Sequence, residues 1–367
     1  MIQRTIVLAI VAALLAAAAC RRDERQQAIA VKAAYATASL SHEPDDPAIW
    51  VHPSDPAKSL IIGTMKAAAP DGAIVVFGVD GSTRQVIAGI DRPNNVDVEY
   101  DFHLSDGSVD IVVATERLQR RLRVFRVDAA EGRLIDLGGI PILEEQQGEA
   151  GAPMGIALYR RRRDSAIFAI VSPKTGPPDG YLWQYQLFET APGRIGARFV
   201  RRFGRFSAML LRPDNEIEAV AVDDELGYVY YADEADGIHK WHADADHPDA
   251  GRELAHFGRT GFRGDREGIA IYTAAGGTGY LVCTDQLDQN SEYHIYRREG
   301  APGNPHDHAE VAVFRGGADA TDGLEISSRP LGPGLSSGVM IAMNHTARNF
   351  LVFGWSDVAA ALHALVH

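Results

Sequence analysis

The sequence predicts an all-β fold, and three observations support this prediction. A short pattern of an acidic or polar residue, a small residue and alternating apolar positions occurs six times, at intervals of roughly 50 to 60 residues. Runs rich in Val, Ile and Tyr, bounded by Gly, Pro and Asp, lie between these occurrences. Outside the N-terminus, only the last dozen residues (SDVAAALHALVH) have a helical periodicity. Because strand repeats of this length are typical of a β-propeller, six repeats predict a six-bladed β-propeller.

The first residue of each repeat is called its anchor. The six anchors are Asp46 (DPAIW), Asn94 (NNVDV), Met154 (MGIAL), Glu218 (EAVAV), Glu267 (EGIAI) and Asp322 (DGLEI). Roughly 30 residues after each anchor, another strand-like run ends in an aromatic residue, giving the set Phe77, Phe125, Tyr185, Trp241, Tyr296 and Phe353. We expect a strand near residues 28–38 to complete the last blade, which would close the ring and leave no open sheet edge.

The N-terminal segment, residues 1–20, has the features of an export signal peptide. Arg4 provides positive charge, and residues 6–19 (IVLAIVAALLAAAA) are apolar but too few to span a membrane. The run ends at Cys20 in a pattern that resembles the lipobox of bacterial lipoproteins, so Cys20 is the expected lipidation site. The alternative is ordinary cleavage that leaves a spare cysteine. Either way we expect an exported protein, lipid-anchored in the bacterial cell envelope (periplasmic or outer membrane) or secreted.

The rest of the chain divides into a short connection and one domain. Residues 21–35 (RRDERQQAIAVKAAY) are expected to form a polar tether, and residues 36–367 the propeller. The chain of 367 residues is 46% hydrophobic, which supports a large buried core. Its formal charge of −13 argues against a nucleic-acid partner, which requires a broad basic face. Two cysteines, Cys20 and Cys283, cannot build a disulfide framework or a multi-cysteine metal site.

The anchors predict a metal site. The first strand of each propeller blade lines the central channel, so the anchors should form a ring at one mouth. Four of them are carboxylates, which repel one another unless a cation lies among them. Oxygen ligands at a roomy site favour Ca²⁺ over zinc or copper. The alternative is that these acidic residues only cap the starts of strands and turns.

Several stretches carry a family resemblance that spans residues 45 to about 355. They include DDPAIWVHPSDPAKSLIIGTMK (45–66), NNVDVEYDF (94–102), VDIVVATER (109–117), EAVAVDDELGYVYYADE (218–234), REGIAIY (266–272) and TDGLEI (321–326). The chain thereby resembles the β-propeller phytases, calcium-dependent enzymes that remove phosphate from myo-inositol hexakisphosphate (phytate). The resemblance implies a phosphoric monoester hydrolase of the 3-phytase type, in which more than one bound Ca²⁺ holds phosphate and activates a water molecule.

Transferred residue by residue, the resemblance assigns roles to positions of this chain. The implied catalytic carboxylates, which are also metal ligands, are Asp46, Glu218, Glu267 and Asp322. Asp45 is an additional implied metal ligand. The implied phosphate-binding residues are Lys66, Arg117 and Lys174. The partner is then a phosphorylated small molecule, the membrane is met only through the lipid anchor, and the protein is expected to be a monomer.

The chain departs from the family pattern at several positions. Met154 stands where a Tyr touches calcium and phosphate, and Ala67 where a second Lys follows Lys66. A late Asp- and Asn-rich loop is shortened to MNHTARNF. We therefore expect fewer calcium ions than a full family member binds. Two alternatives stay open: a propeller without catalysis that binds a ligand or protein, and another calcium-dependent propeller hydrolase of the lactonase type.

Overall fold

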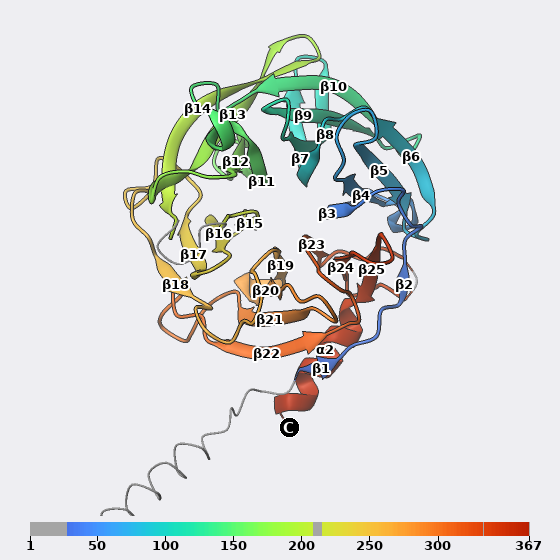
Figure 1. Cartoon of the computed structure of the whole chain (residues 1–367), viewed down its shortest axis with the longest axis vertical. Coiled ribbons are helices and arrows are strands. Elements are labelled where there is room, and N and C mark those ends of the chain that lie inside the picture. Colours follow the sequence, from blue (N-terminus) through green and yellow to red (C-terminus); the bar gives the residue numbers. More distant parts are fainter. Residues whose placement is uncertain (1–27, 208–214, 333, 367) are drawn as a thin grey trace, which may run out of the picture.

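The computed structural model describes residues 28–207, 215–332 and 334–366. Six β-sheets are arranged around a central axis like the blades of a propeller (Figure 1). This arrangement confirms the predicted all-β, six-bladed β-propeller. The predicted signal peptide, with Cys20, lies outside the described residues.

Each blade is an antiparallel meander whose strands run outward from the channel in chain order. The first blade comprises β3 (Pro44–Trp50), β4 (Leu60–Met65), β5 (Ala73–Gly78) and β6 (Thr83–Ala88). The second comprises β7 (Pro93–Leu104), β8 (Gly107–Glu116), β9 (Arg121–Asp128) and β10 (Arg133–Pro141). The third comprises β11 (Pro153–Arg160), β12 (Ile167–Pro173), β13 (Asp179–Ala191) and β14 (Arg194–Arg205).

The second half of the ring repeats this plan. The fourth blade comprises β15 (Val220–Asp223), β16 (Tyr228–Asp233), β17 (Gly237–His242) and β18 (Ala255–Phe257). The fifth comprises β19 (Ile269–Thr273), β20 (Gly279–Asp285), β21 (Glu292–Arg297) and β22 (Glu310–Arg315). The sixth comprises β23 (Leu324–Ser327), β24 (Val339–Asn344) and β25 (Asn349–Gly354). Short 3₁₀ turns occur at Pro56–Lys58, Gly148–Gly151 and Ala275–Gly277.

The N-terminal residues close the ring. Strand β2 (Tyr35–Ala36) pairs antiparallel with β25, which confirms the predicted completion of the last blade. Strand β1 (Ile29–Ala30) pairs parallel with β22 and adds a fifth strand to the fifth blade. The tether expected over residues 21–35 therefore differs from the structure, in which the propeller already begins at Ile29. The reason is the apolar character of Ile29 and Val31, since both pack against the apolar core beside the fifth and sixth blades.

The core lies between neighbouring blades. Each of the six aromatic residues found by their spacing is on the third strand of its blade and is buried. Phe77 of the first blade, for example, meets Phe350 of the sixth edge to face, with ring centroids 6.1 Å apart. These contacts hold the blades at fixed angles, and they thereby fix the positions of the inner strands around the channel.

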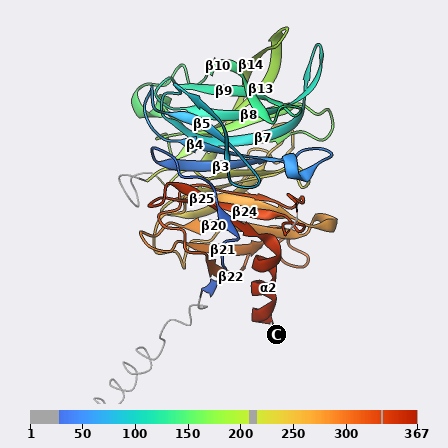
Figure 2. The ribbon, with the colours of Figure 1, turned by 90° about the vertical axis from the view of Figure 1, so that its right-hand side faces the viewer.

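One helix follows the last strand, as the helical periodicity of the final residues predicts. Helix α2 (Trp355–Val366) lies against the rim beside β1 (Figure 2). Its Trp355 stacks on Tyr272 with the ring centroids 3.9 Å apart, and Val358 and Leu362 are buried in the same core. Among the described residues, no helix is long and apolar enough to cross a membrane.

Candidate functional site

One mouth of the channel, which we call the anchor mouth, collects the starts of the inner strands. Asp45, Asn94 and Met154 lie at the beginning of β3, β7 and β11, and Glu218, Glu267 and Asp322 directly precede β15, β19 and β23. In an antiparallel pair, the residue that follows the second strand returns to this same end. Residues at that position are Lys66, Arg117, Lys174, Glu234 and Gln286. The anchor mouth thus brings together carboxylates, amides and cations from all six blades.

The small residue after an anchor allows the next blade to approach. A Cβ atom at Gly155 would lie 2.0 Å from the backbone oxygen of Glu218. One at Gly323 would lie 2.0 Å from Oδ1 of Asp46. Such distances are far shorter than any van der Waals contact. The repeated small residue is therefore a packing requirement that keeps the anchors close to one another.

Lys66 is the central cation of the mouth. Its Nζ lies 2.5 Å from Oδ1 of Asp45, 3.3 Å from Oδ2 of Asp322 and 3.5 Å from Oε1 of Glu43. Burial alone would lower the pKa of Lys66, but the charges of the surrounding carboxylates, Asp45 and Asp322 first, raise it well above its ordinary value. Lys66 is therefore charged and joins the first blade to the sixth across the mouth.

The carboxylates around Lys66 outnumber the cations near them. Burial raises the pKa of Glu218, Lys66 and Arg117 oppose this rise, and Asp45 and Glu216 add to it, so that the pKa reaches about 7. Glu218 Oε2 accepts a hydrogen bond of 3.1 Å from Nδ2 of Asn94. This anchor of the fourth blade is therefore in direct contact with the anchor of the second, and its charge is strongly disfavoured without a cation.

Two further anchors have the same character. Burial raises the pKa of Asp322 well above its ordinary value, although Lys66 opposes this rise, and Gln286 donates a hydrogen bond of 2.5 Å to its Oδ1. Burial also raises the pKa of Glu267 well above its ordinary value, and the nearest contributing charges are Glu234 and then Glu218. The anchor carboxylates thus form one electrostatically coupled group.

The structure also brings Glu234 and Asp265 to the mouth, which sequence reasoning missed. One carboxylate oxygen of each, together with one of Glu267, forms a group whose members all lie within 4.8 Å of one another. The signal for Glu234 was present, because it directly follows the second strand of its blade, as Lys66 does in the first. Asp265 has no such signal, since it lies in an irregular segment bridged to Gln286.

The adjacent residues Asp45 and Asp46 point to different surroundings. Asp45 contacts the Lys66 ammonium group at the mouth, whereas Asp46 lines the channel interior, a cavity of about 400 Å³. Oδ2 of Asp46 accepts a hydrogen bond of 2.9 Å from the amide of Val96. Burial raises the pKa of Asp46 well above its ordinary value, and Asp45, Glu325 and Asp97 add to the rise. The alternation of side chains along a strand accounts for this division.

The three basic residues chosen from the sequence all lie near Glu218. Lys66 and Arg117 both lower the pKa of Glu218 by their charge, while Lys174 forms an ion pair with the neighbouring Glu216. Arg117 is half-buried and makes no ion pair within residues 28–207, 215–332 and 334–366. The structure therefore brings all three cations to the mouth, with Arg117 the least neutralised of them.

Met154, the anchor that departs from the polar pattern, is fully buried. Its carbonyl oxygen accepts a hydrogen bond of 2.6 Å from Oγ1 of Thr115, so its backbone is fixed although its side chain offers no oxygen. The third blade therefore supplies no anchor ligand of the kind that a hard cation prefers. The side chain that the third blade does bring to the chemistry of the mouth is that of Lys174.

These raised pKa values predict that the metal-free protein loses stability as the pH rises. The folded state keeps a proton on Glu218 up to about pH 7, whereas the unfolded chain releases it near the ordinary glutamate value. Between those values the folded state binds more protons, so the free energy of unfolding falls with rising pH, by about 1.4 kcal/mol per unit of pKa difference. Urea unfolding in chelator from about pH 5 to about pH 8 measures this. A stability that increases over this range would contradict the assignment.

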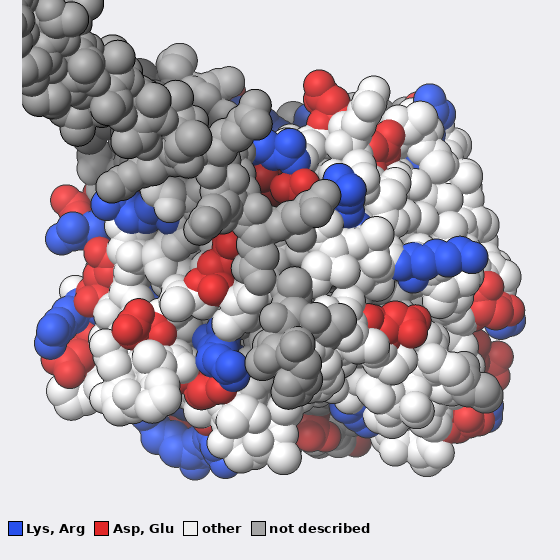
Figure 3. Space-filling view, turned by 90° about the horizontal axis from the view of Figure 1, so that it is seen from below, with Lys and Arg blue, Asp and Glu red and all other residues white. Residues whose placement is uncertain are grey.

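The charged side chains on the face shown in Figure 3 do not form a continuous basic surface. Lys and Arg are interspersed there with Asp and Glu. This mixture agrees with the net charge of −13.

Comparisons with known proteins give a consistent result. A sequence model of the phytase family matches residues 1–365. The 3-phytase of Bacillus subtilis (strain 168) is 28% identical over 337 residues, covering 87% of this chain and 81% of that protein. Among solved structures, an α-L-arabinofuranosidase from Fusarium graminearum has a TM-score of 0.53 at 8% identity, covering 88% of this chain and 98% of that chain. This last likeness concerns the fold alone.

Proposed function

Because the chain belongs to the phytase family, it is a phosphoric monoester hydrolase that acts on phytate, and we propose that the anchor mouth performs this reaction with calcium. The observation that carries the assignment of the site is the convergence of Asp45, Glu218 and Asp322 on Lys66 at this one mouth. Carboxylates and phosphate-binding cations are both required for the chemistry, and the two kinds of residue lie together here.

The residues present fit calcium. All the anchor ligands are oxygen atoms, which calcium prefers, and neither cysteine nor histidine is among them. The buried carboxylates, moreover, hold their protons until a cation compensates their charge, which favours a site that binds one. Candidate ligands are Asp45, Asp46, Glu218, Glu267 and Asp322, joined by Glu234 and Asp265. When bound, calcium would supply Lewis acidity and an activated water molecule.

The basic residues bind the substrate. Phytate carries many negative charges, and the acidic mouth would repel it if no cation were present. We propose that Lys66, Arg117 and Lys174 contact its phosphate groups, Lys as a point charge and Arg through paired N–H groups. Lys66 is held by Glu43, Asp45 and Asp322 and positions a phosphate beside them, whereas the half-buried Arg117 makes no ion pair among the described residues and so keeps its charge for the substrate. The side chains thereby hold the scissile phosphate against the carboxylate group.

Phosphate release from phytate by the protein, first with calcium and then with a chelator, tests this function. We expect activity only in calcium, and we expect the melting temperature to rise with calcium. Binding adds RT ln(1 + [L]/Kd) to the free energy of unfolding, about 2.7 kcal/mol when calcium is 100-fold above Kd. Full activity in chelator, together with a melting curve indifferent to calcium, would remove calcium from the proposal while leaving the phytase assignment intact.

Three further properties are proposed on narrower grounds. The relative from Bacillus subtilis is named a 3-phytase, so we propose that hydrolysis begins at position 3 of the inositol ring of phytate. Separation of the pentakisphosphate isomers formed after brief hydrolysis tests this. Residues 1–20 support export with lipidation at Cys20, tested by mass spectrometry of the processed protein. The ring is closed by the pairing of β2 with β25, which supports a monomer.

A further inference from the structure

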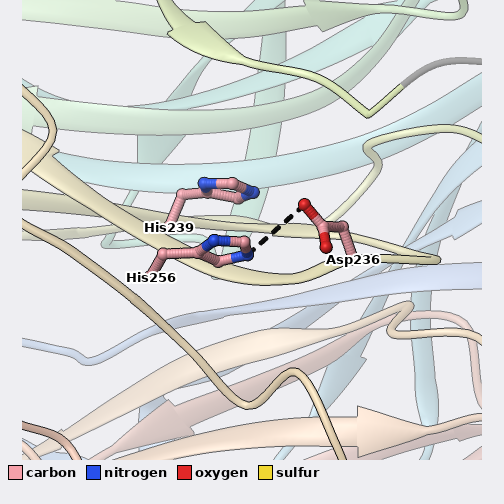
Figure 4. Close-up of side chains that lie close together, drawn as sticks. All are labelled: Asp236, His239 and His256. Carbon is pink, nitrogen blue, oxygen red and sulfur yellow. Dashed lines mark ion pairs between the residues drawn. The ribbon is translucent and has the colours of Figure 1, made fainter. Parts of the chain in front are cut away.

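The outer strands of the fourth blade hold a further group of side chains, farther from the channel than the inner strand β15. Asp236 lies in the turn between β16 and β17, His239 on β17 and His256 on β18 (Figure 4). One ligand atom of each residue lies within 4.8 Å of the corresponding atom of the other two. His239 and His256 are directly opposite each other in the pairing of β17 with β18. Antiparallel pairing therefore places both imidazoles on the same face of the blade.

The imidazole of His239 is oriented like that of a metal ligand. Its side chain is 3% exposed, and its Nδ1 lies 2.5 Å from Oε1 of Glu253. That contact assigns the ring proton to Nδ1 and leaves a lone pair on Nε2. Nε2 is buried and has no hydrogen-bond partner among the described residues. A histidine that donates one ring N–H to a carboxylate and presents the other nitrogen to a cation is the usual arrangement in metal sites.

The other two residues complete the donor set. Nε2 of His256 lies 3.5 Å from Oδ2 of Asp236, the pair drawn with a dashed line in Figure 4. Burial lowers the pKa of His256, and His239 adds to the effect, which favours the neutral ring that ligation requires. A Cβ atom at Gly237 would lie 3.0 Å from this same Nε2, so the glycine leaves space beside the nitrogen.

We propose that Asp236, His239 and His256 form a binding site for a Zn²⁺ ion, separate from the calcium ligands of the anchor mouth. Two imidazole nitrogens and one carboxylate oxygen are a common zinc donor set, and a fourth position is left for water. Calcium takes oxygen ligands and is disfavoured here. Glu253 is a positioning residue that holds His239 through its Nδ1–H. The proposal does not depend on catalysis.

The site would join a short outer strand to the rest of its blade. Strand β18 has three residues, and only His256 of them offers a metal ligand. In the structure the rings of His239 and His256 are stacked, with centroids 4.1 Å apart and planes at 14°. A metal ion lies near the plane of each ring that binds it, so binding must tilt one ring out of the stack. His256 is the partly exposed ring of the two, and it is free to make this movement.

The surrounding charges modulate the site without blocking it. Arg259 lies 3.3 Å from Oδ1 of Asp236, and Arg205 lies 3.9 Å from Oε2 of Glu253. Both arginines are largely exposed, so water screens their repulsion of a cation. Each arginine contacts the carboxylate oxygen that does not face a histidine. Oδ2 of Asp236 therefore stays available to a metal ion, and Oε1 of Glu253 still accepts the hydrogen bond from His239.

Two other histidine groups are weaker candidates. His242, His247 and Asp249 form a similar set, but His247 and Asp249 are exposed, and Nδ1 of His247 already accepts a hydrogen bond of 3.1 Å from the amide of Asp249. The group around His294 contains one imidazole, held by Glu310 at Nδ1, and the oxygens of Asp285 already accept hydrogen bonds from the amides of Arg263 and Gly264. The first of these groups is therefore the proper control.

The test is a zinc titration of the calcium-saturated protein, followed by calorimetry and thermal melting, with Co²⁺ absorption as a reporter of the ligand geometry. We expect one zinc ion per chain, a higher melting temperature with zinc, and a tetrahedral-type Co²⁺ spectrum. His256→Ala and Asp236→Asn should lose binding, and His256 is exposed enough for its variant to fold. Glu253→Gln should weaken binding about 10- to 100-fold.

The control variants are His247→Ala and His103→Ala, which should bind zinc as the wild type does. Loss of binding in His247→Ala together with its retention in His256→Ala would assign zinc to the other group and overturn the proposal. No binding by the folded wild type at micromolar zinc would also overturn it. Phytate hydrolysis is measured in parallel, so failure of the zinc site is distinguishable from failure of the calcium proposal.

Discussion

Asp322→Asn is expected to abolish phytate hydrolysis while the propeller stays folded. Both carboxylate oxygens of Asp322 accept hydrogen bonds. Oδ1 accepts one from the side-chain amide of Gln286, and Oδ2 accepts one from the ammonium group of Lys66. An amide must point its NH₂ group at one of these two donors, so the variant breaks a contact whichever way it turns. It also removes a negative charge from the proposed calcium ligands. We expect kcat/KM to fall by at least about a hundredfold.

A matched control lies on the same inner strand. Glu325, three residues further on, is likewise a half-buried carboxylate, and desolvation raises its pKa, here to about 8. It lines the channel interior near Asp97 rather than the mouth. Glu325→Gln should therefore keep most of the activity. The variants are compared by phosphate release at saturating calcium, with circular dichroism as the test of folding. Activity lost in Glu325→Gln but kept in Asp322→Asn would place catalysis deeper in the channel.

The fold could be predicted because the anchors and the aromatic residues each recur once in every blade. The anchors mark where inner strands begin, and the aromatic residues mark the third strands, since each position needs a side chain that fits between blades. The tether predicted for residues 21–35 did not anticipate the pairing of Ile29 with Phe314 of β22, which joins residues distant in sequence. No local pattern reveals such a partner.

The site was only partly predictable, for a similar reason. Asp45 and Asp46 are adjacent, so strand alternation predicts that they face opposite ways, but it does not show which of the two faces Lys66. Glu234 could have been found by hairpin geometry, whereas Asp265 could not. The zinc candidate needs the register of β17 with β18, which no short motif encodes.

The second large effect is expected for Gly155→Ala, a change that adds one methyl group behind the ring of anchors. The backbone dihedral of Gly155 is not in the left-handed region, so alanine fits the backbone and the effect comes from space alone. The new Cβ would lie 2.0 Å from the carbonyl oxygen of Glu218, 2.8 Å from its carbonyl carbon and 2.9 Å from Oγ of Ser172. Backbone atoms cannot rotate away, so the fourth blade must shift relative to the third.

Such overpacking should lower the free energy of unfolding by about 1 to 3 kcal/mol. The shift also moves Glu218 from its hydrogen bond with Asn94, so calcium affinity and phytate hydrolysis should fall together. Gly251→Ala is the control, because a Cβ there meets no atom within 4 Å and its dihedral is ordinary. Urea unfolding in chelator separates the packing effect from metal binding, since no calcium contributes there. If Gly155→Ala and Gly251→Ala unfold alike and are equally active, the anchors of the third and fourth blades are not in the close contact on which the geometry of the mouth depends.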